Sequence, residues 1–216
     1  MKYIAALIFM GSFTLAHASF EEVMLVPGFA QQKLPEESFN SVIAKMADTF
    51  APLAREIGRE LEFYSDYHHD WAQAFARRWE TDQIIVYGGI AAIQGMTEDS
   101  LVLSLCHELG HLYGGLPYHD SYNRLSVEGQ ADYWAANFCF PKIATENAWA
   151  RTLAAGLVIT SFFADNRGVP HPGSETPDYT QVDRTLMTHP GPQCRLDTFL
   201  AGASNQGRPA CWYFAL

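Results

Sequence analysis

The feature that most constrains this chain is the run Cys-His-Glu-Leu-Gly-His at residues 106–111. Two histidines four residues apart lie on one face of a helix, so His107 and His111 can reach the same metal ion. Glu108 lies between them and points toward a water on that metal, where it can act as a general base. A carboxylate that follows a short way downstream, Glu128, is the predicted third ligand. This pattern predicts a metal centre with three protein ligands and one open position, which is the catalytic arrangement.

A buried helix is predicted around this motif. Thr97 is a typical N-cap, acidic residues follow it in the first turn, and the pair Gly114 and Gly115 ends the helix. Gly110 costs about 1 kcal/mol relative to alanine inside a helix, which indicates close packing or a nearby metal. The leucines that predict burial of this helix are Leu101, Leu103, Leu105, Leu109 and Leu112.

A second acidic residue, Asp132, lies one helical turn after Glu128 on the same predicted face. From there it can accept a hydrogen bond from a ligand histidine and orient the imidazole. Imidazole and carboxylate ligands favour one zinc ion (Zn2+) per chain, although ligand type also admits another divalent ion. The alternatives are two core histidines on a buried helix, a solvated Glu128 at a helix start, and a surface ion pair for Asp132.

The first 18 residues have the pattern of a secretory signal peptide. Lys2 precedes an apolar stretch that is too short for a membrane span, and Ala-His-Ala at 16–18 is a typical cleavage site. The alternative is an N-terminal membrane anchor. The mature chain, residues 19–216, is predicted to be a single domain, exported to the periplasm or secreted, without stable membrane insertion after cleavage. Its net charge, −10 for the full chain, argues against nucleic acid as a partner.

Periodicity along the mature chain predicts an α+β fold with strands early and helices late. We expect a helix at 36–57 that Pro52 kinks or splits, and short strands at 61–64 and 73–77. The clearest strand is 82–90, which is rich in β-branched and aromatic residues. A helix is predicted at 126–140, ended by Pro141, and another at 144–163, followed by a loop rich in glycine and proline at 165–178.

Several of these segments resemble the CAAX prenyl protease/HtpX/BepA-like peptidase family. Its members are gluzincin zinc endopeptidases, related in architecture to thermolysin, so the resemblance implies a small sheet beside the metal helix and a mostly helical second half. Gln73 departs from the family pattern, where asparagine is usual. The short segment between His111 and Glu128 implies a soluble member of smaller size. The matching segments are Ala74-Phe75-Ala76, Ile84 to Ile90, Met96-Thr97-Glu98-Asp99, the HELGH run, Glu128-x-x-Ala131-Asp132, and Thr188-His189-Pro190 with Arg195.

The last of these segments implies two further site residues. His189 is expected to lie over the open metal position and donate a hydrogen bond to the oxyanion that forms during hydrolysis. Arg195 is expected to serve the same purpose or to hold the loop of His189. The alternative for this segment is a structural His-Pro turn.

Four cysteines in an exported chain predict at least one disulfide. Cys139 falls on the same helical face as Glu128 and Asp132, by i, i+4, i+11 spacing, and Cys194 lies in the segment that is expected to approach the site. The pattern therefore favours a Cys139–Cys194 bridge. For Cys106, a buried free thiol is favoured over a fourth metal ligand.

The function predicted from the sequence is an exported zinc endopeptidase that acts on polypeptide substrates. Glu108 would take the proton of the attacking water and pass it to the leaving amine. An edge strand at Ile84–Ile90 would pair with the extended substrate. The alternatives are a zinc-stabilised folding or assembly factor that does not cut, and a metallohydrolase of non-protein amides such as cell-wall peptide. The intact Glu108 argues against the first, because a binding site has no need of a base.

Overall fold

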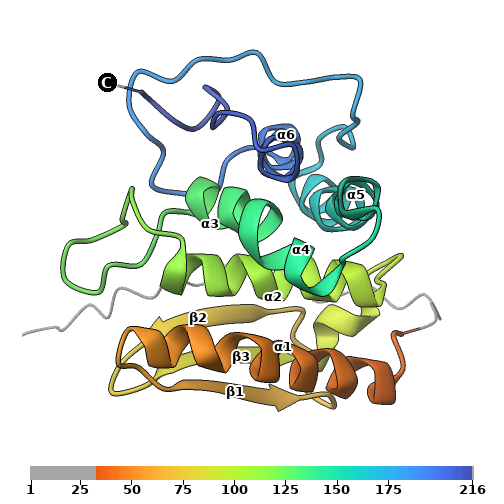
Figure 1. The fold of residues 1–216 in the computed structure, drawn as a ribbon. Helices are drawn as coiled ribbons and strands as arrows, with labels where there is room; N and C mark the ends of the chain where they lie inside the picture. Colours follow the sequence, from red (N-terminus) through yellow and green to blue (C-terminus); the bar gives the residue numbers. More distant parts are fainter. Residues whose placement is uncertain (1–32, 216) are drawn as a thin grey trace, which may run out of the picture.

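The computed structural model describes residues 33–215, and the predicted signal peptide at 1–18 lies outside them. Helices α1 and α2 pack against a small three-stranded sheet at one side of the molecule (Figure 1), which confirms the predicted α+β class. Helix α1 and the sheet lie at one side of the molecule, α2 crosses the middle, and α5 and α6 lie at the other side. The described part of the chain contains no helix that is long and apolar enough to cross a membrane.

Helix α1 (Glu36–Glu56) covers the sheet with an apolar face that repeats at helical spacing. The helix continues without a break through Pro52, so the prediction that this proline splits it in two is wrong. The proline lies on the exposed face, where water can satisfy the Asp48 carbonyl that loses its helical partner. The buried residues of α1 are Phe39, Val42, Ile43, Met46, Phe50 and Ala54.

The sheet has the order β1-β3-β2, with β1 (Leu61–Asp66) parallel to β3 (Asp82–Tyr87) and β2 (Ala74–Arg78) antiparallel to it. The prediction of an edge strand at Ile84–Ile90 is therefore wrong. The strand ends at Tyr87, a 3-10 turn follows at Gly88–Ala92, and β3 is paired on both sides. Its residues are buried on both faces, which is typical of a central strand. The strand at the edge next to α2 is β2.

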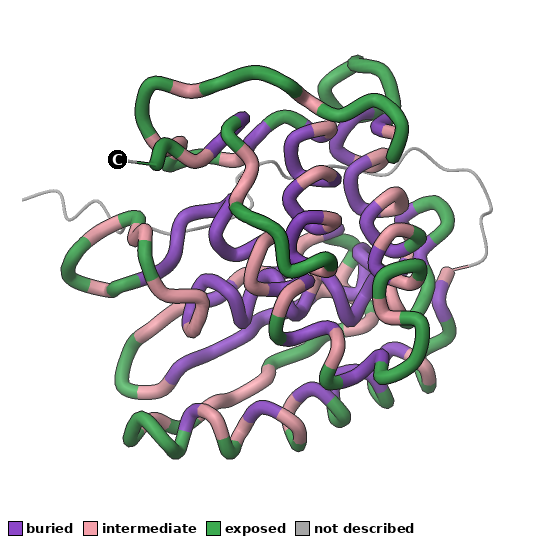
Figure 2. Tube along the Cα trace, turned by 45° about the horizontal axis from the view of Figure 1, so that its top comes forward, coloured by how far each residue is buried: buried purple, intermediate pink, exposed green. Residues whose placement is uncertain are grey.

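Helix α2 (Glu98–Tyr113) forms the centre of the molecule and contacts β2, α1, α3 and α5. Thr97 caps it by accepting a hydrogen bond from the Ser100 N–H at 3.1 Å, as predicted. Most of its residues are buried, and buried chain gathers in the middle of the molecule (Figure 2). The site described below is therefore built on the most deeply packed helix.

The predicted helix at 126–140 consists of three parts. Helix α3 (Glu128–Trp134) continues through a π-helical turn (Ala135–Cys139) into the short α4 (Phe140–Ile143). The helical segment continues past Pro141 to Ile143, so the proline does not end it as predicted. Helices α5 (Ala148–Arg167) and α6 (Pro192–Ala203) then pack against each other.

Two disulfides are present, Cys106–Cys139 and Cys194–Cys211. At least one disulfide was predicted and is confirmed, but the favoured Cys139–Cys194 pairing and the free Cys106 thiol are wrong. The cause is the π-helical turn, whose extra residue per turn rotates Cys139 away from the face of Glu128 and toward α2. The first bridge thus joins the residue before His107 to the end of the helical segment that carries Glu128.

Candidate metal centre

Three side chains that could bind a metal ion meet in the interior: His107, His111 and Glu128. The two histidine Nε2 atoms are 3.1 Å apart, and Glu128 Oε2 is 3.1 Å from His107 Nε2 and 3.4 Å from His111 Nε2. Ligands at about 2.0–2.1 Å from a tetrahedral zinc are separated by about 3.3 Å. The three atoms are therefore spaced like the corners of one face of such a tetrahedron.

Each histidine is oriented by a hydrogen bond on its other ring nitrogen. His107 Nδ1 is 2.7 Å from Asp132 Oδ1, and His111 Nδ1 is 2.8 Å from the carbonyl oxygen of Ser126. Both partners are acceptors, so each Nδ1 carries the proton in the neutral imidazole. The Nε2 lone pairs then face each other and a carboxylate, which is unfavourable unless a cation lies among them. This donor set fits a metal ion.

Asp132 lies where the sequence predicted it, beside a candidate ligand histidine, and a cation holds it there. Arg195 donates to both oxygens of Asp132, from Nε at 2.8 Å and from Nη2 at 2.7 Å. Both side chains are buried, and the guanidinium also lies 4.6 Å from the ring of Phe163. Arg195 is thus the ion-pair partner of Asp132, a contact that the sequence did not predict.

The electrostatics of this cluster favour cations. Burial lowers the pKa of His107, but Asp132, Glu128 and Glu108 outweigh that effect and raise it to about 10. Burial raises the pKa of Glu128, but the surrounding histidines outweigh it and hold the pKa well below the usual range. The pKa of Asp132 is likewise lowered, because Arg195 and His107 overcome the cost of burial. Both carboxylates are thus charged at neutral pH, and they attract a proton or a metal ion to the space between the imidazoles.

Glu108 is buried next to this group but takes part in none of the hydrogen bonds described above for its members. Its Oε1 has no hydrogen-bond partner within the described residues, and the backbone of Ala76 in β2 is a hydrogen-bond neighbour of the carboxylate. Burial raises the pKa of Glu108 to about 7, against the opposing effect of His107 and His111. A buried carboxylate that exchanges a proton near neutral pH has the properties of a general base.

His189 reaches the same group from the long connection between α5 and α6, which is exposed for most of its length (Figure 2). Its Nε2 is 3.0 Å from Glu128 Oε2, and its ring stacks between His107 and Phe163 at centroid distances of 6.3 and 6.0 Å. Burial lowers the pKa of His189, against the effect of Glu128. The side chain is therefore neutral at pH 7, and it lies beside Glu128 at the metal group.

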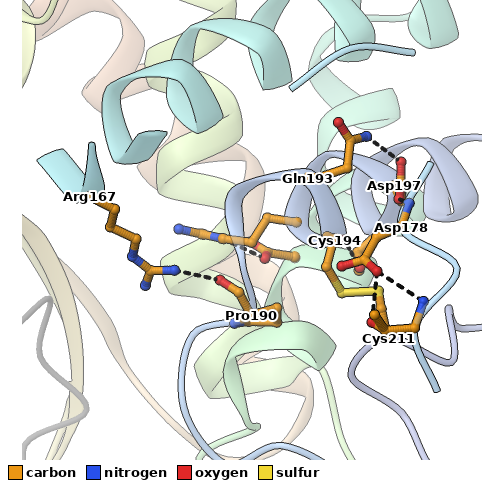
Figure 3. The surroundings of a disulfide bond; sticks show 11 residues. Arg167, Asp178, Pro190, Gln193, Cys194, Asp197 and Cys211 are labelled. Carbon is orange, nitrogen blue, oxygen red and sulfur yellow. Dashed lines mark hydrogen bonds and ion pairs between the residues drawn. A yellow bond between two sulfur atoms is a disulfide. The ribbon is translucent and has the colours of Figure 1, made fainter. Parts of the chain in front are cut away.

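The connection is fixed at its end by the second disulfide and its neighbours. Figure 3 shows Arg167 of α5 donating to the Pro190 carbonyl, at 3.2 Å, beside the Cys194–Cys211 bridge at the start of α6. Gln193 donates to Asp197 at 2.8 Å on the same helix turn. These contacts hold the residue that follows His189 and therefore limit how far its ring can move.

Close packing of α2 and α3 brings the three candidate ligands together. A Cβ at Gly110 would lie 2.6 Å from the Ala131 carbonyl oxygen, and one at Gly129 would lie 2.2 Å from the Trp212 ring. Only glycine allows these approaches, which confirms the close packing predicted at Gly110. Trp212 follows Cys211 directly, so the second disulfide also supports α3.

Two contributions were missed from the sequence. The Ser126 carbonyl orients His111, and Phe163 lies between Arg195 and His189. A backbone acceptor leaves no signal in the sequence, and Phe163 is one apolar residue in an apolar helix. The other group of potential ligands, which consists of Asp178, Cys194 and Cys211, is occupied by the disulfide and offers no thiolate. No family model, curated protein or solved structure matches this chain.

Proposed function

We propose that this protein is an exported zinc endopeptidase with a gluzincin-like metallopeptidase fold, similar to the CAAX prenyl protease/HtpX/BepA-like family. The observation that carries the proposal is the unpartnered, buried Oε1 of Glu108 beside the group His107, His111 and Glu128. A group that only binds a metal has no use for a buried base whose pKa is raised to about 7. The two disulfides support a role in an oxidising compartment outside the cytoplasm.

The proposed reaction is hydrolysis of a peptide bond. A bound zinc ion would supply Lewis acidity, lowering the pKa of a water to about 7 and polarising the peptide carbonyl. Glu108 takes the proton from that water as its oxygen attacks the carbonyl carbon. Glu108 then transfers the proton to the nitrogen of the leaving amine as the C–N bond breaks. His107, His111 and Glu128 would hold the metal, and Asp132 with Arg195 keeps His107 oriented.

His189 is the proposed donor to the oxyanion. The neutral imidazole donates one ring N–H, and its stacking against Phe163 keeps the ring beside the metal group. Its present neighbour, Glu128 Oε2, is also a candidate metal ligand, so metal binding leaves the His189 N–H available for substrate.

The strand that fits an extended substrate is β2. It is an edge strand, lies beside α2, and places Ala76 next to Glu108. A peptide added to this edge by backbone hydrogen bonds would pass the scissile carbonyl across the metal group. This role replaces the one expected of Ile84–Ile90, since β3 is central.

The experiment is a digest of an unfolded protein such as casein by the purified mature chain, with metal content measured on the same sample. We expect about one zinc per chain and cleavage that a chelator stops and added zinc restores. The His107→Ala and His111→Ala double variant should lose both the metal and the cleavage. Full zinc occupancy in that variant would contradict the ligand assignment, and cleavage by the fully chelated protein would contradict the mechanism.

A further inference from the structure

An apolar pocket opens directly beside Glu108. Its walls come from β2, from the segment between β3 and α2, and from α5. Glu108 is the one ionisable side chain among its lining residues. The apolar walls are formed mainly by Ala74, Ile93, Met96, Ile159, Phe162 and Phe163.

Among the residues that line the pocket, Glu108 is the only one whose side chain has a polar atom without a hydrogen-bond partner. Its only hydroxyl belongs to Ser104, which already donates to the Ser100 carbonyl at 2.9 Å. A polar side chain placed there would lose its hydrogen bonds to water without replacement. An acidic side chain would in addition be repelled by the Glu108 carboxylate. The occupant must therefore be apolar.

The position of the pocket determines which residue of a substrate it meets. In the proposed function, on which this inference rests, Glu108 delivers a proton to the nitrogen of the leaving amine. The side chain of the residue that carries this nitrogen is attached to the neighbouring Cα atom. It is therefore within reach of the pocket wall that Glu108 forms. We propose that this pocket binds the side chain of the residue immediately after the cleaved bond, and that it selects small apolar side chains such as alanine and valine.

The size of the pocket sets the selection. Its volume is about 20 Å³, whereas a cavity needs about 10–15 Å³ by the same measure to hold a single water molecule. This space accepts a group of one or a few carbons but not the branched end of leucine or a phenyl ring. Protein interiors resist overfilling, so a larger side chain must displace packed residues.

Phe162 lines the pocket and is the residue best suited to enlarging it by substitution. It is only partly buried and meets Phe163 edge-on, with ring centroids 5.6 Å apart. Phe163 packs against Arg195 and His189 and so belongs to the supports of the metal group. Phe162 has no such contact with these two residues, so its ring can be removed without disturbing them. Met96, in the segment between β3 and α2, is a second lining residue whose truncation would enlarge the pocket.

The test compares peptides that differ only in the residue after the cut: alanine, valine, leucine, phenylalanine or aspartate. Wild-type protein should cleave the alanine and valine peptides about 10- to 200-fold faster in kcat/KM than the others, the range that a misfit of a few carbons produces. Phe162→Ala should raise kcat/KM for the leucine and phenylalanine peptides by at least about tenfold, and Met96→Ala should act in the same direction. Equal rates for all five peptides with the wild-type protein would overturn the proposal.

The matched control is Phe138→Ala, which removes the same ring from a different cavity, lined by Tyr113 and Trp134 among others. This variant should keep the wild-type preference. If Phe138→Ala changes the preference as much as Phe162→Ala does, the pocket beside Glu108 is not the selecting site and the proposal fails.

A binding experiment distinguishes a failure of this inference from a failure of the proposed function. Short peptides that begin with the same five residues represent the amine product, and their affinity for the chelated, metal-free protein can be measured by calorimetry. The peptides that begin with alanine and valine should bind at least about tenfold more tightly than the others, and Phe162→Ala should reverse the order. If this order is found but no peptide is ever cleaved, the pocket proposal stands and the peptidase proposal fails. If none of the peptides binds, or all bind equally, the pocket proposal is overturned.

Discussion

Asp132 is the residue on which most of the cluster depends. It accepts the hydrogen bond of His107 and two hydrogen bonds from Arg195, and all three side chains are buried. Its removal therefore has two effects. It frees the imidazole of His107 to rotate, and it leaves the guanidinium of Arg195 in the interior without its partner.

We expect Asp132→Ala to lower zinc affinity by about 10- to 100-fold, because the ligand histidine is no longer oriented. The free energy of unfolding of the metal-free protein should fall by about 3–5 kcal/mol, the cost of an uncompensated buried charge. Zinc titration and denaturant unfolding measure the two quantities. The control is Asp99→Ala, which breaks the more exposed ion pair with Arg151 at the start of α2 and should leave zinc affinity unchanged. Equal zinc affinities for wild type and Asp132→Ala would show that Asp132 does not position a ligand.

Glu108 should determine the acidic side of the pH profile. Burial raises its pKa to about 7, and only the ionised carboxylate can take a proton from water. A bound cation favours the ionised form, so activity should be present above pH 7 and lost as the pH falls through a value at or below 7. The measurement is kcat/KM from pH 5 to pH 8 with metal content determined at each point. A profile that stays flat down to pH 5 would contradict this role, provided that the metal stays bound.

At the scale of elements, the crossing of α2 and α3 brings His107 and His111 close to Glu128. The two helices touch at Gly110, where a side chain would collide with the Ala131 backbone. Because backbone atoms cannot move away as a flexible side chain can, any Cβ at this position must push the helices apart.

We expect Gly110→Ala to lower the free energy of unfolding by about 1–3 kcal/mol through overpacking, although alanine is the better helix former by about 1 kcal/mol. Zinc affinity should fall as well, because Glu128 moves away from the two histidines. The control is Gly207→Ala, at an exposed position outside the helices with open space for a Cβ, which should change neither quantity. Denaturant unfolding and zinc titration of both variants provide the comparison. A Gly110→Ala protein as stable as wild type would show that α2 and α3 are not held at this distance.

Local features of these elements could be predicted from the sequence, because neighbouring residues determine them. The apolar spacing of α1, the Thr97 cap and the histidine spacing on α2 are of this kind. The position of β3 in the sheet could not be predicted, since it depends on which strands approach it from elsewhere in the chain. The π-helical turn at Ala135–Cys139 leaves no clear sequence signal either, and missing it led to the wrong disulfide pairing.

At the scale of the whole molecule, the candidate site combines elements that are far apart in the sequence. Helix α2 supplies two histidines, α3 supplies Glu128 and Asp132, and α6 with the connection before it supplies Arg195 and His189. The sequence correctly suggested that these residues belong together, since they meet in the interior. What the sequence could not give was the partner of Arg195, because the packing of α6 against α3 brings it to Asp132 from a distant part of the chain.

The central claim is that Glu108 makes this metal group a peptidase, and the Glu108→Gln variant tests it most directly. The change is nearly isosteric and removes only the base, so metal content should stay at about one zinc per chain while kcat/KM for a peptide falls by about 100- to 10,000-fold. Glu98→Gln, an exposed position on the same helix, should match wild type in both measurements. A Glu108→Gln protein that retains its metal and cleaves peptides at the wild-type rate would contradict the account.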